Sequence, residues 1–187
     1  MAPEEMKSTE KKAGKHGRGL VIVYTGTGKG KTTAALGILL RAWGRDMKVV
    51  MLQFMKSTTS NYGEHRAARR LGIEIVALGA GFTWHTKVPD KGRSLAVELW
   101  EKAREKITSG DYHLVVLDEF SYPIQYGWVP VKIVLQTLKE RPSWVHVVIT
   151  GRDMPSELID FADIVTDMAE VKHAFTEGIK AQPGIEF

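Results

Sequence analysis

Residues 25–33 read TGTGKGKTT, and no other stretch constrains the fold as strongly. The apolar run LVIVY at 20–24 comes directly before it, and the Ala- and Leu-rich run AALGILL comes directly after it. A Gly-rich turn that links a buried strand to a helix and ends in Gly-Lys-Thr is typical of a Walker A loop, where backbone amides and the helix dipole hold a polyphosphate. An ordinary turn would explain the glycines but not the Lys-Thr pair. The stretch therefore predicts a site for nucleotide phosphates.

The loop differs from the usual Walker A pattern at its first position. Counted back from Lys31 and Thr32, the pattern G-x-x-x-x-G-K-[ST] requires a glycine where this chain has Thr25. Main-chain amides, the Lys31 charge and the Thr32 hydroxyl, which is placed to bind a magnesium ion, can still form the site. We assign nucleotide binding to Gly26, Thr27, Gly28, Lys29, Gly30, Lys31, Thr32 and Thr33.

A second half of the site is expected at the end of a neighbouring strand. The segment HLVVLDEF at 113–120 places Asp118 and Glu119 after an apolar run, the Walker B arrangement in which an acid completes a magnesium shell directly or through water. Because adjacent strand residues point to opposite faces, we expect only one of the two acids to face the phosphates squarely. Two solvated acids at a strand end would leave the same pattern, so the assignment depends on the nearby Walker A loop.

Short apolar runs alternate with helical patterns from Gly19 onward. Near-continuous apolar character predicts strands buried on both faces, as in a parallel sheet, at 20–24, 49–54, 73–78, 113–120, 144–150 and 163–168. Helices are predicted at about 31–43, 63–71, 91–108, 130–140 and 155–162. The alternation predicts an α/β fold of three layers, with right-handed crossovers and a mainly parallel sheet of about six strands.

The sequence also predicts which residues of one helix are buried and which residues lie near the ligand-binding edge of the sheet. In the helix expected at 91–108, apolar residues recur at helical spacing at Leu95, Leu99, Trp100, Ala103 and Ile107. Ligands of such sheets bind beyond the carboxyl ends of the strands. The residues that fall near those ends are Thr25, Gln53, Leu78, Glu119 and Thr150.

The composition of the chain excludes several kinds of functional site and limits the expected location and partners. The chain has no cysteine, which excludes disulfides, thiolate metal sites and cysteine nucleophiles. A net charge of +4 with dispersed basic residues permits nucleic-acid binding without indicating it. The apolar runs are strand-sized, so we expect no membrane span and a cytoplasmic location. From the length of 187 residues we expect a single domain at 19–187, preceded by a flexible, charge-rich tail at 1–18 that could order over a ligand.

Five segments together resemble one enzyme family. They are TGTGKGKTTAALG, LGAGFTW, VVLDEFSY, VVITGRD and the terminal VKHAFTEGIKAQPGIEF. In this order and at similar spacing they resemble the ATP:corrinoid adenosyltransferases of cobalamin biosynthesis and corrinoid salvage, from about Gly19 to Phe187. Other P-loop enzymes share the Gly-rich loop but not the GFTW segment or the terminal one.

The resemblance implies a RecA-like P-loop fold and a specific reaction. In this family, the reduced cobalt of cob(I) attacks the 5' carbon of ATP and releases intact triphosphate, which is held in the reverse of the usual direction. The family's loop also lacks the first Walker glycine. The resemblance further implies Mg²⁺ (or Mn²⁺), ATP as co-substrate, and cobalamin, cobinamide or a cobyrinic acid derivative as substrate. An electron-donating reductase or flavodoxin and a homodimeric assembly are implied as well.

Site residues carry over from the family onto matching positions of this chain. Lys31, Thr32 and Glu119 are implied as catalytic, and Thr32, Asp118 and Glu119 as metal ligands. Where the family most often has Asn or Asp within the loop, this chain has Thr27, which puts only a local hydrogen bond in doubt.

The GFTW segment supplies the implied corrinoid contacts. Phe82 and Trp84 match aromatic residues that push away the lower axial ligand of the corrinoid, leaving four-coordinate cobalt that is easier to reduce. Aromatic rings are more often core residues, although a Gly-rich loop beyond a strand end argues against that here. His85 follows at a position with no assigned role.

Two alternatives remain open from the sequence. A P-loop kinase or ATPase would use the same loop on a hydroxyl or water and release ADP, although the cysteine zinc ribbon of the thymidine kinases is absent. A nucleotide-dependent nucleic-acid-binding module would need a basic stripe, whereas RAARR at 66–70 reads as a solvated helix face. Nucleic acid and membrane are therefore not expected partners.

Overall fold

The computed structural model describes residues 17–57, 62–79 and 89–186. The strands of this part of the chain are β1 (Val21–Thr25), β2 (Val49–Ser57), β3 (Glu74–Gly79), β4 (Leu114–Asp118), β5 (His146–Thr150) and β6 (Ile164–Asp167). The helices are α2 (Lys31–Trp43), α3 (Gly63–Leu71), α4 (Pro89–Thr108), α5 (Ser121–Gln125), α6 (Val131–Glu140), α7 (Ser156–Phe161) and the 3₁₀ helix η1 (Ala174–Glu177). Each predicted strand and helix has a counterpart among them.

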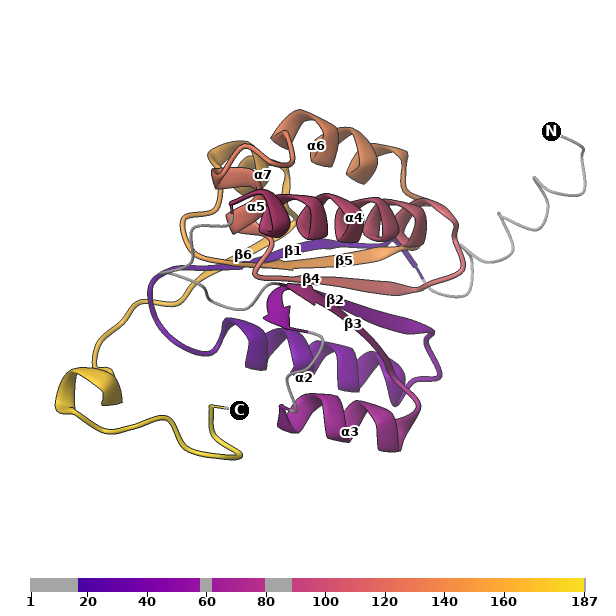
Figure 1. Ribbon diagram of the computed structural model, residues 1–187. Helices are drawn as coiled ribbons and strands as arrows, with labels where there is room; N and C mark the ends of the chain where they lie inside the picture. Colours follow the sequence, from indigo (N-terminus) through magenta and orange to yellow (C-terminus); the bar gives the residue numbers. More distant parts are fainter. Residues whose placement is uncertain (1–16, 58–61, 80–88, 187) are drawn as a thin grey trace, which may run out of the picture.

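The six strands form one sheet in the order β3-β2-β4-β5-β1-β6 (Figure 1). All neighbouring pairs are parallel. A parallel sheet requires a crossover between neighbouring strands and burial on both faces, which is why its strands read as apolar runs. The sequence-based prediction of a parallel six-stranded sheet is confirmed.

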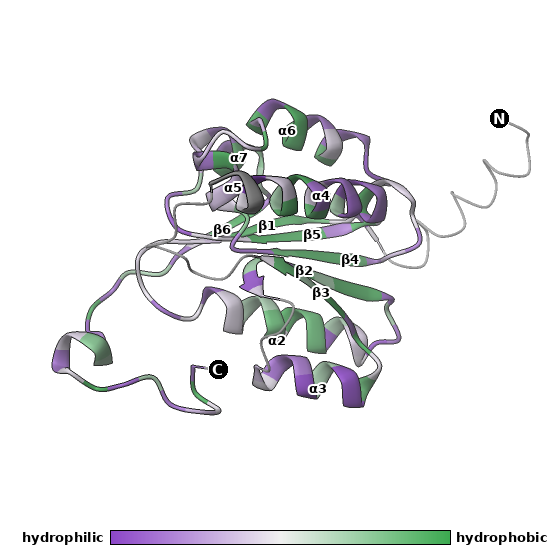
Figure 2. Ribbon diagram, viewed as in Figure 1, coloured by the Kyte–Doolittle hydropathy of each residue, from purple (hydrophilic) through white to green (hydrophobic). Residues whose placement is uncertain are grey.

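Helices cover both faces of the sheet. Helices α4, α5, α6 and α7 lie on one face, and α2 and α3 lie on the other (Figure 1). Successive strand residues alternate between two buried clusters: Val21 and Val23 pack on the α4 side, and Ile22 packs on the α2 side. The strands include the most hydrophobic segments of the chain (Figure 2), in line with this double burial. The prediction of double burial is wrong for β6, whose four residues are all exposed, because β6 is an edge strand of the sheet. The architecture is that of a three-layer P-loop NTPase fold, as predicted.

The apolar stripe of α4 anchors the connection that carries the candidate acids. Leu99, Ala103 and Ile107 are fully buried, as the helical spacing predicts. The Trp100 ring stacks on the Phe120 ring, with centroids 5.1 Å apart and planes 16° apart. Because Phe120 lies between β4 and α5, this contact holds the chain directly after Asp118 against the core.

Strand β4 ends two residues earlier than the apolar pattern predicts. Glu119 has a φ of 57°, in the left-handed region that interrupts a strand, and its amide donates to the Thr150 hydroxyl at 3.0 Å. The short helix α5 then begins at Ser121, and no helix was predicted there because five residues are too few to show a helical period. Strand β2 runs on to Ser57, so Gln53 lies inside this strand and not at its end.

The described residues that follow β6 lie outside the three layers. The tail predicted at 1–18 lies almost entirely outside the described residues, so it stays a prediction. Beyond β6, residues 168–186 form an arm that carries η1 and passes along the edge of the molecule (Figure 1), with nearly all of its side chains exposed. In the part of the chain that the structure describes, no helix combines the length and the apolar character needed to cross a bilayer.

Candidate active site

The Gly-rich loop links the carboxyl end of β1 to the start of α2. Gly30 has a φ of 113° and Gly26 a φ of 96°, so both positions use the left-handed freedom of glycine. At Gly26 a side chain would also collide, because a Cβ would lie 2.2 Å from the Asp167 Oδ1 atom. Among the described residues no side chain caps α2, so amides at its start are available to a bound anion.

Lys31 folds back over the loop that precedes it. Its buried ammonium donates to the carbonyls of Gly26 at 2.8 Å and Gly28 at 2.7 Å. Burial lowers the pKa of Lys31 from its ordinary value, and the nearby Glu119 carboxylate opposes this shift. Because an ammonium has three donors, a further N–H is left for a phosphate oxygen. The Gly28 amide, by contrast, is engaged by the Met168 carbonyl at 2.6 Å.

Thr25, which stands in place of the first Walker glycine, makes its contacts outside the phosphate loop. Its side chain is buried, and its hydroxyl accepts a hydrogen bond from the Met154 amide, in the connection between β5 and α7, at 3.3 Å. Its carbonyl accepts from the Met168 amide at 2.9 Å. The threonine therefore ties β1 to the chain segments after β5 and β6.

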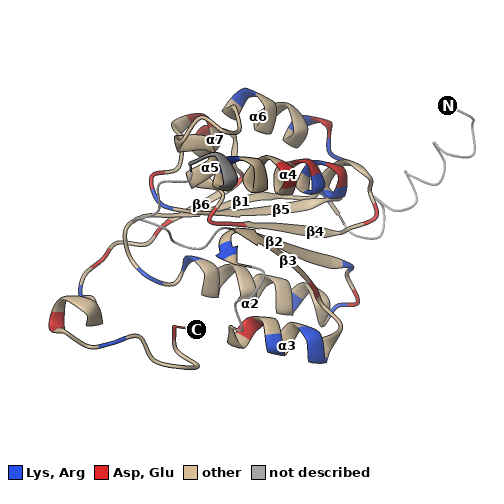
Figure 3. Ribbon diagram, in the orientation of Figure 1, with Lys and Arg blue, Asp and Glu red and all other residues tan. Residues whose placement is uncertain are grey.

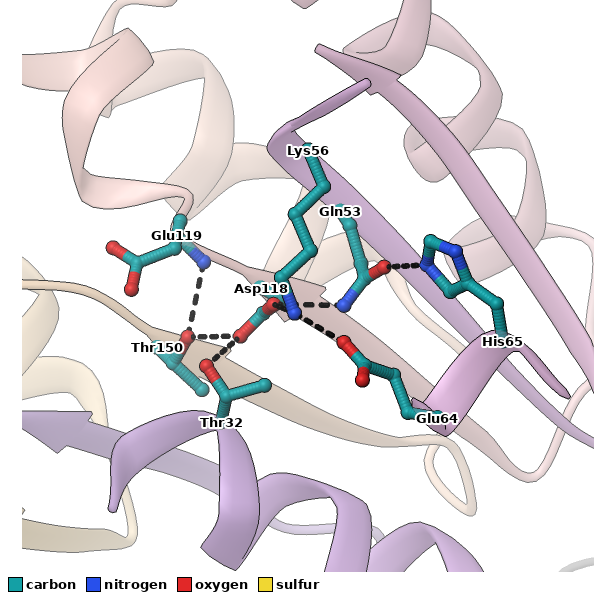
Figure 4. A network of polar contacts seen from close by, with 8 residues as sticks. All are labelled: Thr32, Gln53, Lys56, Glu64, His65, Asp118, Glu119 and Thr150. Carbon is teal, nitrogen blue, oxygen red and sulfur yellow. Dashed lines mark hydrogen bonds and ion pairs between the residues drawn. The ribbon is translucent and has the colours of Figure 1, made fainter. Parts of the chain in front are cut away.

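Asp118 is the polar centre of the site. It is 0% exposed, and its Oδ1 atom accepts from the hydroxyls of Thr32 and Thr150, each at 2.8 Å (Figure 4). Its Oδ2 atom accepts from Gln53 Nε2 at 3.1 Å. The strand register brings these groups together, because Gln53 is directly opposite Asp118 in the β2–β4 pair. The acid of the predicted Walker B segment thus binds the threonine of the Walker A loop.

The hydroxyl of Thr32 is suited to a cation. An ionised carboxylate can only accept hydrogen bonds, so the Thr32 hydroxyl donates its one hydrogen bond to Asp118. The lone pairs of the hydroxyl oxygen are left for a metal ion. Among the described residues, no cluster of three or more His, Asp or Glu side chains could hold a metal by itself. A Mg²⁺ ion at Thr32 would therefore depend on nucleotide phosphate oxygens for much of its coordination, as Mg²⁺ commonly does.

Glu119 lines the same pocket as Thr32, whereas Asp118, which accepts from the Thr32 hydroxyl, is not part of the lining. The left-handed backbone of Glu119 turns the chain out of the strand and lets the Glu119 carboxylate reach the pocket, while the Asp118 side chain stays fully buried. Burial and the neighbouring Asp118 carboxylate raise the pKa of Glu119, while Lys31 opposes the shift. Glu119 is placed to contribute a second carboxylate to a bound cation.

A pocket of about 720 Å³ opens at the loop, large enough for a nucleotide. It is lined by Gly28, Lys29, Gly30, Lys31, Thr32, Thr33, Leu36, Lys56, Gly63, Glu64, Glu119, Tyr122, Arg152, Gly184, Ile185 and Glu186. Of the residues that the sequence assigns to nucleotide binding, Gly26 and Thr27 are absent from this lining, and Gly26 instead accepts a hydrogen bond from Lys31.

Several lining residues have no assignment from the sequence. Lys56 and Glu64 form an ion pair that joins the end of β2 to the start of α3. Arg152 and Tyr122 follow the carboxyl ends of strands, within segments that carry the family resemblance. Their positions in the sequence could therefore have identified them as pocket residues. Glu186 pairs with Lys29 at 2.5 Å and comes from the terminal segment that carries the family resemblance, but its pairing with Lys29 has no local signal in the sequence.

The basic run at 66–70 lies on α3. Arg66, Arg69 and Arg70 are all exposed, and Figure 3 shows basic positions on this helix. Their exposure agrees with the interpretation as a solvated helix face. The predicted corrinoid contacts Phe82 and Trp84, and the unassigned His85, lie outside the described residues, so the structure does not place them relative to the pocket.

Comparisons with known proteins identify the family. Residues 17–187 match the family model described as ATP:corrinoid adenosyltransferase BtuR/CobO/CobP. The chain is 41% identical over 170 residues to the corrinoid adenosyltransferase of Escherichia coli K12, covering 91% of this chain and 86% of that protein. It is 38% identical to one from Sinorhizobium sp., covering 100% and 92% of the two chains.

A solved structure supports the fold independently of close sequence similarity. The flagellar accessory protein FlaH of Methanocaldococcus jannaschii superimposes with a TM-score of 0.55 at 12% identity, covering 86% of this chain and 77% of that one. At 12% identity this structural similarity shows a shared fold and nothing about function. The family match, the relatives and the architecture agree: the chain belongs to the ATP:corrinoid adenosyltransferase family.

Proposed function

We propose that this protein transfers the 5'-deoxyadenosyl group of ATP to the cob(I) centre of a corrinoid and releases triphosphate. The electron pair of cob(I) forms the cobalt–carbon bond at the 5' carbon, and the C5'–O bond breaks with its pair passing to the triphosphate oxygen. The observation that carries the proposal is the contact of Thr32 with Asp118 beside an open phosphate loop, in a chain that matches the family over nearly its whole length.

The protein's own residues are arranged to stabilise the leaving triphosphate. Negative charge grows on the departing oxygens, and donors that are already oriented lower the barrier most. Lys31 is held in place by two loop carbonyls, and the start of α2 adds amides and a positive dipole end. No general base is required, because the nucleophile is a low-valent metal in the substrate.

We propose Mg²⁺ or Mn²⁺ as the ion of this site, held by Thr32 with Asp118 and Glu119. The lone pairs of the Thr32 hydroxyl and the two carboxylates are hard oxygen donors, which fits either ion. When bound with ATP, such an ion supplies positive charge to the triphosphate. The reversed direction of the triphosphate is proposed from the family resemblance alone, because Thr25 does not line the pocket.

The remaining assignments follow from family membership. We propose that Phe82 and Trp84 contact the lower face of the corrinoid, and that a reductase or flavodoxin supplies the electron. A homodimer and a cytoplasmic location belong to the same proposal. Cobalamin, cobinamide and cobyrinic acid derivatives are all candidate substrates.

The reaction is tested by its products. Incubated without oxygen with ATP, Mg²⁺ and chemically reduced cobalamin, the protein should form triphosphate and adenosylated corrinoid in equal amounts. The two are measured by chromatography of the nucleotide products and by the absorbance change of the new cobalt–carbon bond. ADP together with a phosphorylated acceptor would instead assign the chain to the kinases.

Replacing Trp84 by alanine tests the corrinoid contacts. If the aromatic pair displaces the lower axial ligand, Trp84→Ala should slow adenosylation of cobalamin when a reductase supplies the electron. The loss should be much smaller with cobinamide, which has no lower base, or with cobalt that is already reduced to cob(I). Steady-state rates with the two corrinoids under both reduction regimes measure the effect.

Spectroscopy separates this role from packing. The four-coordinate fraction of bound cob(II) should fall in Trp84→Ala in parallel with the reductase-dependent rate. An equal loss with both corrinoids and both regimes, with unchanged ATP affinity, would show that Trp84 only packs in the fold.

A further inference from the structure

A chain of buried polar side chains reaches from α3 to the acid of the nucleotide site. His65 Nε2 lies 2.5 Å from Gln53 Oε1, and Gln53 Nε2 lies 3.1 Å from Asp118 Oδ2 (Figure 4). His65 is 9% exposed, and the other two side chains are 0% exposed. Polar groups buried this deeply are costly unless each is paired, so the arrangement constrains the orientation of every member.

The donors and acceptors of this chain can be assigned from Asp118 outward. A carboxylate only accepts, so Gln53 must turn its NH₂ group toward Asp118 and its oxygen toward His65. That oxygen also accepts, so the Nε2 atom of His65 carries the proton. With the amide turned over, its oxygen would face a carboxylate oxygen and its NH₂ group would face an N–H. Asp118 therefore sets the orientation of Gln53, and the N–H of His65 supports that orientation from the other end of the amide.

The orientation of Gln53 matters because Asp118 is shared. Gln53 engages Oδ2, while Oδ1 accepts from Thr32 and Thr150. The angle of the carboxylate sets where the Thr32 hydroxyl lies, and that hydroxyl is the group whose lone pairs remain for a cation. A change at His65 would thus shift the position of the Thr32 hydroxyl, through the two intervening side chains of Gln53 and Asp118.

We propose that His65 is a positioning residue of the nucleotide–metal site, acting through Gln53 on Asp118 and through Asp118 on Thr32. This inference rests on the proposed function for its metal ion, but it concerns ATP binding and not transfer to cobalt. The first turn of α3 makes a second link to the same acid, because Glu64 pairs with Lys56, whose Nζ lies 3.9 Å from Asp118 Oδ2. The placement of α3 and the placement of the metal acid are therefore coupled.

A purely structural role for His65 makes different predictions. The His65 ring also packs edge-on against Tyr62, with centroids 5.6 Å apart, so the residue could serve only to attach α3 to the sheet. Either role predicts lower stability when His65 is replaced. Only the positioning role predicts a loss confined to metal-dependent ATP binding and dependent on the presence of Gln53.

The test measures ATP affinity by calorimetry, without corrinoid, in Mg²⁺ and in EDTA. His65→Leu should weaken ATP binding in Mg²⁺ about 10-fold, the lower end of the range for residues that orient metal ligands. Affinity in EDTA should stay unchanged. In a Gln53→Leu background, the His65→Leu change should add no further loss, because no amide is left to orient. His65→Gln, which keeps an N–H donor near the place of Nε2, should retain most of the affinity.

Thr137→Val is the matched control. Thr137 is a buried polar residue on α6 whose hydroxyl donates to the Ile133 carbonyl at 3.0 Å, away from the pocket lining. Its replacement should lower the melting temperature without changing ATP affinity. If His65→Leu does not fold, His65→Gln and His65→Asn are compared, since the shorter amide of Asn should not reach Gln53.

Two outcomes would overturn the proposal. One is an equal loss of affinity in Mg²⁺ and EDTA. The other is additivity of the His65 and Gln53 changes, since independent sites add and coupled ones do not. A protein that binds Mg²⁺ and ATP with these couplings but forms ADP would retain the His65 role and lose only the proposed reaction.

Discussion

Replacing Lys31 or Thr32 by alanine lowers the rate of corrinoid adenosylation about 100-fold or more, the expected cost of removing a main electrostatic contact to a developing negative charge. Lys31→Ala removes the buried ammonium that both holds the loop carbonyls and faces the pocket. Thr32→Ala removes the hydroxyl between Asp118 and the proposed metal ion. Initial rates with prereduced cob(I) and saturating ATP measure both losses.

Lys29→Ala is the matched control for charge. It removes the same charge two positions earlier in the loop. Lys29 also lines the pocket, but it is exposed and its ammonium pairs with Glu186, whereas the buried ammonium of Lys31 binds the loop carbonyls. Ion pairs at exposed positions contribute little, so we expect a much smaller loss of rate. Circular dichroism should show all three variants folded. Wild-type rates in Lys31→Ala or Thr32→Ala would refute the assignment of the site.

Asp118→Asn should reduce adenosylation about as strongly, by about 100-fold. The change keeps the shape of the side chain but removes the charge that would help to hold a cation. It also leaves a buried donor mispaired, because the new NH₂ group must face either Gln53 Nε2 or the hydroxyls at Oδ1. An unsatisfied buried group costs about 1–3 kcal/mol, so the variant should also unfold at lower denaturant concentration.

Thr150→Val separates the two effects of Asp118→Asn. Thr150 donates to Asp118 Oδ1 and accepts from the Glu119 amide, but it carries no charge and is not among the proposed metal ligands. Its replacement should cost stability with a smaller loss of rate. Higher Mg²⁺ should partly restore Asp118→Asn and have little effect on Thr150→Val. Equal rate losses in both variants, unaffected by Mg²⁺, would mean that Asp118 serves only the fold.

Strand and helix positions follow closely from local patterns in the sequence. Apolar runs marked β1 to β6, and the 3.6-residue period marked the buried face of α4 at Leu99, Ala103 and Ile107. The phosphate loop was also predictable, because its chemistry depends on residues that are consecutive in the chain. Both kinds of signal work because burial and backbone conformation act over a few neighbouring residues.

The contacts of Asp118 could not be predicted in the same way. Gln53 stands out in the sequence as a polar residue within an apolar strand, but its partner depends on the register of β2 against β4. His65 reaches Gln53 only because α3 packs beside this strand. The ion pair between Lys56 and Glu64 depends on the same placement of α3. These pairings join residues from separate elements, so no local period records them.

The sequence by itself determined the α/β class, the parallel sheet and the phosphate loop, because each depends on local composition and spacing. Only the tertiary structure decided which carboxylate binds Thr32, how Thr25 is accommodated, and that the left-handed turn at Glu119 brings the second acid to the pocket. It also decided that Glu186, from the far end of the chain, meets Lys29. The physical reason is that hydrogen-bond partners are selected by strand register and helix packing, which form through contacts between residues far apart in the chain.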